Sequence, residues 1–179
     1  MSVSYEYEVE RLAAIEQSRL LSDDADKIFN HIVETLSVIV YAPIAAITIL
    51  DANKQWFLSS KGLDLESTPK SEAICSHTIQ SSDIFVVENT TKDNRFQNKL
   101  LVNNTPFIRS YAGLAIRDKN MYPLGAICVI DKKPRTFTPA ELKALKDIRA
   151  VTEKAIALIA EGRNTKSIEL EVDSVLIGD

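Results

Sequence analysis

The sequence predicts an α+β fold with a central, largely antiparallel β-sheet of five to six strands flanked by helices. Three observations support this fold class. Short runs of β-branched and aromatic residues, each of strand length, occupy the middle of the chain. Most connections between successive elements, helices included, are too short for a parallel crossover, which needs a dozen or more residues. Amphipathic helical patterns lie towards both ends, where helices can cover a sheet.

The charge and composition limit the classes of partner. The 179 residues carry a formal charge of −4 and a pI near 5.3. This acidic balance argues against nucleic acid, because phosphate binding needs a basic face. The sequence has no apolar run of the roughly 18 residues that span a bilayer. Its acidic start, MSVSYEYEVERLAAIEQ, lacks the features of a signal peptide. We therefore expect a cytoplasmic protein with no membrane partner and with free thiols.

The first quarter of the chain predicts two helices. Residues 5–20 place apolar side chains near one face at helical spacing. Ser22 is typical of an N-cap, and the aspartates that follow it complement the positive end of the next helix. This second helix has apolar residues every three or four positions and ends before Pro43.

The central part of the chain predicts strands and short helices. The expected strands are residues 44–50, 55–62, 84–89, 108–118 and 124–131. The first two form a hairpin through the DANK turn, and the last two form another through KNMYP. A short helix is expected over residues 71–80, and a helix of one or two turns continues to Leu101.

The last helix has the clearest local signals. Thr138 is followed by Pro139 at the first helical position and by Glu141 three residues on, which together form a capping box. The apolar residues of this helix follow a stripe close to a heptad repeat, and Gly162 ends it.

These elements divide the chain into three parts. They are an N-terminal helix (1–21), a main domain (22–163) and a C-terminal tail (164–179). The tail alternates partly at Ile168, Leu170 and Val172, and this pattern leaves open whether the tail is disordered or pairs with another element.

Five segments, taken in their order, resemble one known family. They are APIAAITILDANKQWFLSSKGLDLESTP, SEAICSHTI, VVENTTKDNRFQNKLLVNN, IRSYAGLAI and YPLGAICVIDKKPRTFTPAEL. Together they resemble the GAF domain family, in its bacterial signalling branch, over about residues 9–160. The resemblance implies a GAF/PAS-like sheet with a small-molecule cavity on one face. It also implies N- and C-terminal helices that pack together and often dimerise.

The resemblance further implies a sensory role, in which such domains relay signals to a kinase, cyclase or phosphodiesterase. This sequence contains no kinase motif and no cyclase signature. We therefore expect a free-standing module that forms a homodimer and acts on a signalling protein in trans.

The stretch SEAICSHTI contains residue types that can take part in catalysis or metal binding. It places Cys75 two positions before His77 in a chain with two cysteines and two histidines. On a helix, residues two apart point about 200° away from each other, so these side chains cannot share one substrate or one metal ion. A zinc site needs about four ligands, and His31 and Cys128 lie in other expected elements. We therefore expect no catalytic residues and no metal.

Two activities known in the family bear on these residues. Free methionine sulfoxide reductases resemble this chain in carrying a cysteine near position 75, but they need a partner cysteine after the next strand. That segment, NTTKDNRFQNKLL, has none, and we expect Cys128 to be a small buried residue in its strand. Phytochrome-like members anchor a bilin through a cysteine and a histidine on a later helix, where this chain has RFQNKLL. We therefore expect no cofactor.

A ligand site is better supported elsewhere in the sequence. Arg109, Tyr111 and Gly113 share one face of their strand and can form a cavity wall. Arg109 can hold a carboxylate or phosphate through its planar guanidinium, and an ion pair with Asp93 or Glu88 is the alternative.

The segment DNRF at residues 93–96 begins the short helix that the family places over the pocket. Its amides can receive an anion, and a turn capped by Asp93 with Phe96 in the core is the alternative. The candidate ligand-binding residues are therefore Arg109, Tyr111, Gly113, His77, Cys75, Asp93, Arg95 and Phe96.

These observations favour a non-enzymatic sensory or regulatory module. We expect it to bind a small molecule, such as an anionic metabolite or a nucleotide, and to relay the signal through dimerising terminal helices. Two alternatives stay open. One is a thiol-dependent enzyme similar to free methionine sulfoxide reductase. The other is a protein-interaction domain whose pocket has closed and whose tail recruits a partner.

Overall fold

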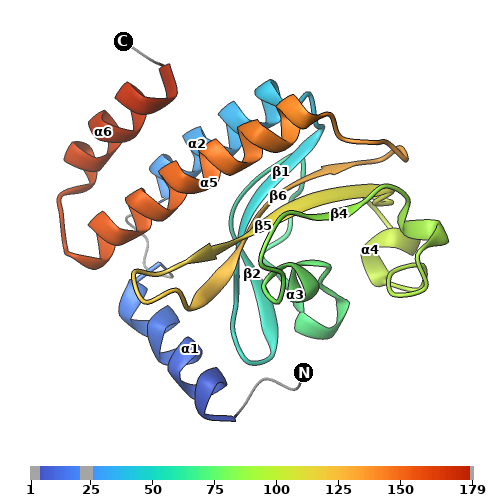
Figure 1. Ribbon diagram of the computed structural model, residues 1–179, viewed down its shortest axis with the longest axis horizontal. Helices are drawn as coiled ribbons and strands as arrows, with labels where there is room; N and C mark the ends of the chain where they lie inside the picture. The colour runs from blue at the N-terminus through green and yellow to red at the C-terminus, as the bar shows by residue number, and fades with distance from the viewer. Residues whose placement is uncertain (1–4, 21–25, 178–179) are drawn as a thin grey trace.

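The computed structural model describes residues 5–20 and 26–177 (Figure 1). The α-helices are α1 (Tyr5–Ser18), α2 (Asp26–Ile39), α3 (Cys75–Thr78), α4 (Leu100–Asn103), α5 (Pro139–Ala160) and α6 (Thr165–Ile177). The strands are β1 (Ile44–Leu50), β2 (Lys54–Lys61), β3 (Ser67–Pro69), β4 (Phe85–Val87), β5 (Ser110–Arg117) and β6 (Pro123–Asp131). Two 3-10 turns are η1 (Lys70–Glu72) and η2 (Thr90–Lys92). The predicted cap at Ser22 lies outside the described residues.

The strands form one six-stranded sheet in the order β3-β2-β1-β6-β5-β4. Every pairing among these described strands is antiparallel. The hairpins β1–β2 and β5–β6 are those that the turn sequences predict, and β1 pairs with β6 to join them at the centre of the sheet. The predicted α+β fold class is confirmed.

Strand β1 shows why the sheet carries two cores. All seven of its residues are buried, because both faces of the sheet are covered. Successive side chains alternate between the faces. Ala45, Ile47 and Ile49 point into the core under the long helices, whereas Ile44 and Ala46 belong to a second core on the opposite face.

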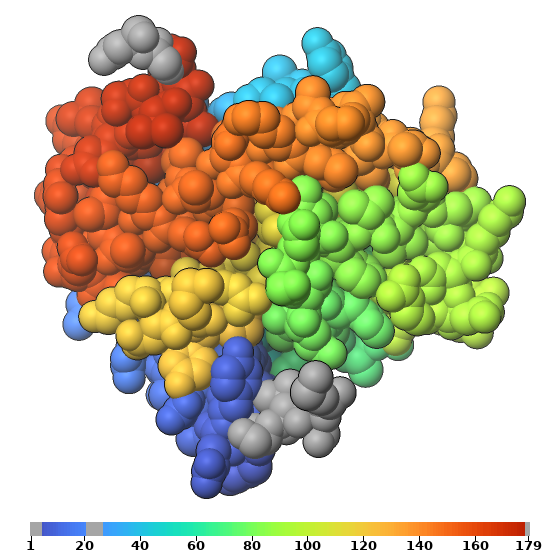
Figure 2. Space-filling model, in the orientation of Figure 1, coloured from blue at the N-terminus to red at the C-terminus, as the bar shows by residue number. Residues whose placement is uncertain are grey.

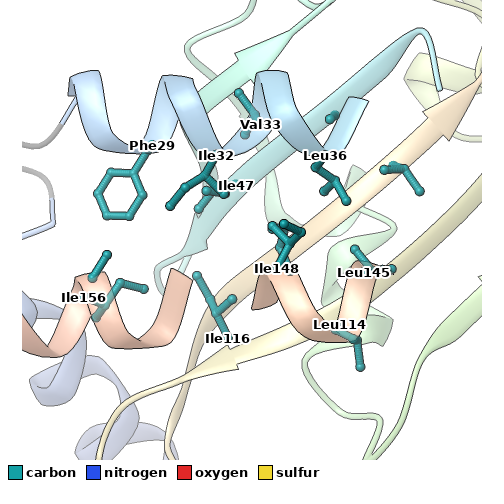
Figure 3. Close-up of a cluster of buried hydrophobic side chains, with 14 of the residues drawn as sticks. Phe29, Ile32, Val33, Leu36, Ile47, Leu114, Ile116, Leu145, Ile148 and Ile156 are labelled. Carbon is teal, nitrogen blue, oxygen red and sulfur yellow. The ribbon is translucent and has the colours of Figure 1, made fainter. Parts of the chain in front are cut away.

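The larger core lies between the sheet and the helix pair α2 and α5 (Figure 3). The close-up shows buried side chains from both helices meeting those of the strands: Phe29, Ile32, Val33, Leu36, Ile47, Leu114, Ile116, Leu145, Ile148 and Ile156. The helical residues recur every three to four positions, which aligns them on the face towards the sheet. Burying each such side chain contributes about 1.5–3 kcal/mol.

Helix α5 begins with the predicted capping box. The Thr138 hydroxyl accepts a hydrogen bond from the Glu141 amide at 3.2 Å, and the Glu141 carboxylate accepts one from the Thr138 amide at 2.7 Å. Pro139 follows at the start of the helix, where its missing N–H costs nothing.

Helix α1 is held against one end of the sheet by a buried arginine. Arg11 is 1% exposed, and its guanidinium donates to both Glu8 carboxylate oxygens at 2.8 and 2.9 Å. It also donates to the carbonyl oxygens of Leu50, at 2.7 Å, and of Pro123, at 3.2 Å. Hydrogen bonds from Arg11 lower the pKa of Glu8 to about 2, and Lys70, 3.1 Å from Glu8, contributes in the same direction. These contacts tie α1 to β1, β6 and η1.

The segment after residue 163 differs from its predicted pattern. It forms helix α6, which lies along α5 (red against orange in Figure 2) and also contacts α2. Ile168 and Val172 are buried, whereas Leu170 is exposed. Residues four apart share a helix face, so the spacing of the buried pair is helical once α2 and α5 offer an apolar surface.

The short elements also depart from expectation. Residues 67–69, expected as part of a loop, pair with β2 as the edge strand β3. The helix expected over 71–80 is divided into η1 and α3, and the one expected before Leu101 into η2, a turn and α4. Elements of three or four residues are too short for hydrophobic periodicity to define them.

Candidate functional site

The sheet face opposite α2 and α5 carries the smaller core and a cavity. The segments containing α3 and α4 cover this face, beside β4 in Figure 1. The cavity has a volume of about 20 Å³. That is close to the minimum that a single water molecule requires. Its walls come from four strands and from the covering segments, through Gln55, Thr68, Glu72, Cys75, Tyr111 and Cys128 among others.

Two cysteines and a tyrosine meet at this cavity. The sulfur of Cys75 lies 3.3 Å from the hydroxyl oxygen of Tyr111, and the hydroxyl oxygen of Thr78 lies 2.6 Å from the same atom. Cys128 faces the same cavity from β6 and interacts directly with Cys75. Cys75, Tyr111 and Cys128 are 3%, 1% and 1% exposed. The cluster is therefore buried and is built from α3, β5 and β6.

The pKa values of the three groups in this cluster are shifted in different directions. Hydrogen bonding with Cys128 lowers the pKa of Cys75, and the Tyr111 hydroxyl adds to that effect. The same contact with Cys75 raises the pKa of Cys128. Burial raises the pKa of Tyr111, and the neighbouring thiols raise it further. Cys75 is thus the group that most readily gives up its proton.

Gly113 leaves the space that the Tyr111 side chain occupies. A Cβ atom at Gly113 would lie 2.3 Å from the Tyr111 hydroxyl oxygen and 2.7 Å from Cζ of the ring. Residues two apart in a strand share a face, so the tyrosine side chain folds over the glycine. This explains why the sequence places a residue without a side chain there.

The outer wall of the cavity is closed by contacts between η1 and α4. The Lys99 ammonium donates a hydrogen bond to the carbonyl oxygen of Ser71. The Leu100 amide donates to the Glu72 carboxylate at 2.7 Å, and this bond satisfies a free N–H at the start of α4. Lys99 and Glu72 both line the cavity. We call these two hydrogen bonds, Lys99–Ser71 and Leu100–Glu72, the η1–α4 latch.

Gln55 places an unpaired acceptor in the wall. The residue is 4% exposed, and its amide nitrogen donates to the Thr68 hydroxyl at 3.3 Å. Within residues 5–20 and 26–177, the Gln55 carbonyl oxygen has no hydrogen-bond partner. An unpaired buried acceptor costs about 1–3 kcal/mol, so most buried polar atoms in proteins are paired.

A second group of predicted residues lies beside the cavity. The His77 ring stacks on Phe85 with centroids 6.0 Å apart and meets the edge of Phe96 at 5.0 Å. Arg95 lies over both phenylalanine rings and forms an ion pair with Asp93 at 2.6 Å. Burial lowers the pKa of His77, and the charges of Arg95 and Lys99 lower it further. These effects favour the neutral form of the His77 imidazole.

Each predicted residue can now be located. Cys75 and Tyr111 line the cavity, and Gly113 lies beneath the tyrosine ring. Cys75 and His77 face different surroundings, as helical geometry predicts. The side chains of His77, Asp93, Arg95 and Phe96 meet in the neighbouring aromatic cluster. Phe96 is fully buried and Asp93 accepts the Arg95 amide, as the alternative of a capped turn predicts.

Among the described residues, Arg109 forms neither of the suggested ion pairs and does not line the cavity, and its binding of a ligand stays a prediction. Its guanidinium donates to the carbonyl oxygens of Val102, at 2.8 Å, and Ile108, at 3.0 Å. The ion pair suggested for it with Asp93 is instead formed by Arg95. Arg109 is therefore a brace for the segment that follows α4, because irregular backbone leaves carbonyl groups in need of donors.

The sequence reasoning missed several cavity residues. They are Gln55, Thr68, Glu72, Lys99 and Cys128. Cys128 is buried in its strand as predicted. The sequence reasoning placed it apart from Cys75, whereas in the structure the two side chains interact. Strand pairing sets Cys128 opposite Gly113, and α3 then brings Cys75 over it. Strand alternation is the signal available for Gln55, since Gln55 and Phe57 both line the cavity while Trp56 packs in the larger core.

The model of the GAF domain matches residues 24–156. The chain belongs to the GAF domain family. A cyclic di-GMP phosphodiesterase of Pseudomonas aeruginosa, PA2567, is 38% identical to it over 130 residues, which are 73% of this chain and 22% of that protein. This GAF domain chain therefore spans about a fifth of that relative's length.

Solved structures of low identity share the fold. The GAF domain of an Acinetobacter phosphoenolpyruvate-protein phosphotransferase has a TM-score of 0.63 at 22% identity, covering 90% of this chain and 99% of that one. The free methionine-R-sulfoxide reductase of Neisseria meningitidis, in complex with its substrate, has a TM-score of 0.60 at 13% identity, covering 86% and 92%. Among the described residues of our chain, none of the helices is both long and apolar enough to traverse a bilayer.

Proposed function

We propose that this GAF domain is a sensory module that binds a small molecule in the cavity behind the η1–α4 latch. It acts by recognition, without catalysing a reaction. The observation that carries the proposal is the Gln55 carbonyl oxygen, which is buried at the cavity and has no partner among the described residues. A ligand that donates a hydrogen bond there removes the cost of the unpaired acceptor.

The cavity dimensions define how a ligand enters. At about 20 Å³ the closed cavity holds one water-sized molecule, so a metabolite requires the latch to open. Opening separates Lys99 from Ser71 and the Leu100 amide from Glu72. These groups are then free to bind a ligand. The ammonium and the exposed amide favour an anionic group, such as the carboxylate or phosphate of a metabolite or nucleotide.

The same segment supplies a path from the cavity to the terminal helices. Glu72 of η1 belongs to the latch, and Lys70 of the same turn forms an ion pair with Glu8 of α1. Helix α1 packs against α5. Ligand entry that displaces η1 therefore changes how α1 is held. The signal passes through the terminal helices, which we propose form a homodimer.

The similarity to a cyclic di-GMP phosphodiesterase suggests the process that is regulated. We propose that the domain controls an enzyme of cyclic di-GMP turnover, either within the same polypeptide or as a separate protein. The similarity covers 22% of that relative's length.

Ligand binding is tested first by native mass spectrometry of freshly purified protein. Thermal unfolding then follows with a panel of nucleotides, dicarboxylates and sugar phosphates. A ligand that binds only the folded state stabilises it by RT ln(1 + [L]/Kd), about 2.7 kcal/mol at 100 times Kd. Gln55→Leu and Lys99→Met should remove this stabilisation, whereas the exposed Lys92→Met should not. Absence of a copurified molecule and of any stabilising compound would contradict the proposal.

The dimer is tested separately by light scattering coupled to size exclusion. We expect the mass of two chains at micromolar concentration. A monomer at every concentration would contradict relay through a homodimer without affecting ligand binding.

A second candidate function is thiol-dependent reduction of free methionine sulfoxide. One observation favours it, namely that Cys75 and Cys128 interact at the cavity. The assay is thiol-coupled reduction of the free amino acid sulfoxide by the wild type and by Cys75→Ser and Cys128→Ser. Turnover that is lost in either variant would favour the enzyme over the sensor.

A further inference from the structure

We propose that Cys75 and Cys128 form an oxidisable pair, which a small hydroperoxide converts into an intramolecular disulfide. This modification site is independent of the metabolite proposed above. It arises because strand β6 and helix α3 bring together two residues that are 53 positions apart in the sequence.

The first argument is the geometry of the pair. Cys128 projects from β6 at the position paired with Gly113, next to the Tyr111 side chain that folds over the glycine. Cys75 begins α3, which packs on β1, β5 and β6. Both side chains line one cavity and belong to one buried cluster. A disulfide needs two cysteines on elements already packed together, which this arrangement provides.

The second argument is the size of the cavity. A volume of about 20 Å³ admits a molecule of roughly the size of water. Hydrogen peroxide, with two oxygen atoms, is among the few oxidants close to that size. Glutathione disulfide and other peptide-sized oxidants are excluded while Lys99 and Glu72 close the wall. The unpaired Gln55 carbonyl oxygen can accept a hydrogen bond from a peroxide O–H.

The third argument is the polarity around the sulfur atoms. Thiolate is the form that attacks a peroxide. Hydrogen bonding from Cys128 and Tyr111 lowers the pKa of Cys75, whereas the pKa of Cys128 is raised. This assigns Cys75 as the attacking thiol and Cys128 as the resolving thiol. Tyr111 remains hydrogen-bonded to Thr78 when its contact with Cys75 is lost.

The reaction balances without another reagent. The Cys75 thiolate attacks one peroxide oxygen, the O–O bond breaks, and the departing hydroxide takes up the proton that Cys75 released. Cys75 is then a sulfenic acid. The Cys128 sulfur attacks it, the S–O bond breaks, and a second water leaves with the Cys128 proton. Two thiols are oxidised, one peroxide is reduced, and α3 becomes covalently joined to β6.

The test uses the folded full chain treated with hydrogen peroxide and then denatured in a maleimide reagent. We expect both thiols to be lost together, with peptide mass spectrometry showing the peptides of Cys75 and Cys128 joined, and dithiothreitol restoring both. Glutathione disulfide at the same concentration should react more slowly than peroxide. Oxidation of the exposed Met121 appears on a separate peptide and does not interfere.

Single variants separate the two roles. In Cys128→Ser, Cys75 should stop at the sulfenic acid, which dimedone traps. In Cys75→Ser, Cys128 should react more slowly than Cys75 does in Cys128→Ser, because burial still disfavours the Cys128 thiolate, and no disulfide should form. Circular dichroism establishes that each variant is folded. Two thiols that stay reduced in the folded wild type, or that oxidise independently to sulfinic acids, would overturn the proposal.

Discussion

The variant Glu8→Gln tests whether a buried ion pair fixes α1 to the sheet. The substitution keeps the shape of the side chain and removes the charge that faces Arg11, which is 1% exposed. Arg11 retains its bonds to the carbonyl oxygens of Leu50 and Pro123. The change therefore isolates the carboxylate.

The magnitude follows from the pKa of Glu8, which falls from 4.5 to about 2 on folding, chiefly through its hydrogen bonds with Arg11. At about 1.4 kcal/mol for each unit, the upper limit is about 3 kcal/mol. The Glu8 side chain is 35% exposed. Since solvent screening weakens such pairs, we expect Glu8→Gln to lower the free energy of unfolding by about 1–2 kcal/mol at pH 7.

The lowered pKa of Glu8 also determines how its contribution to the free energy of unfolding changes with pH. A lowered pKa in the folded state means that the stabilisation is complete above pH 4.5 and is lost as the pH falls towards 2. Urea unfolding of the wild type and of Glu8→Gln should therefore differ most above about pH 5 and converge in acid. The control is Glu6→Gln, an exposed residue of the same helix. A difference that does not vary with pH, or an equal loss in the control, would refute the reasoning.

Three further substitutions test the packing. Gly113→Ala places a methyl group against the Tyr111 hydroxyl. We expect it to lower the free energy of unfolding by about 1–3 kcal/mol, which is measured as a lower Tm. An unchanged Tm would contradict the close contact. Thr138→Ala removes the cap of α5 and should cost about 1 kcal/mol in urea unfolding, whereas the exposed Thr136→Ala should cost much less. Val172→Ala should cost about 1.5 kcal/mol and speed amide exchange in α6. Val175→Ala, at a site that is 52% exposed, should have a smaller effect; equal effects would mean that α6 does not pack as described.

Long elements with a clear period could be predicted from the sequence. The run IAAITIL fixes β1 because β-branched residues buried on both faces suit a central strand. The Thr138 cap fixes the start of α5 because its hydrogen bonds are local. Alternation along β5 likewise puts Tyr111 and Gly113 on the face away from the long helices.

Other features of the protein depend on its tertiary structure and cannot be predicted from local sequence pattern. Helix α6 forms on a surface supplied by α2 and α5, and the guanidinium of Arg11 is buried because distant backbone carbonyls receive it. Cys75 and Cys128 meet through the pairing of strands, which depends on register across the whole sheet. Sequence alone therefore determined the long elements with a clear period, since their signals come from residues close in the chain. Which side chains meet at the cavity was set by contacts between residues far apart in sequence.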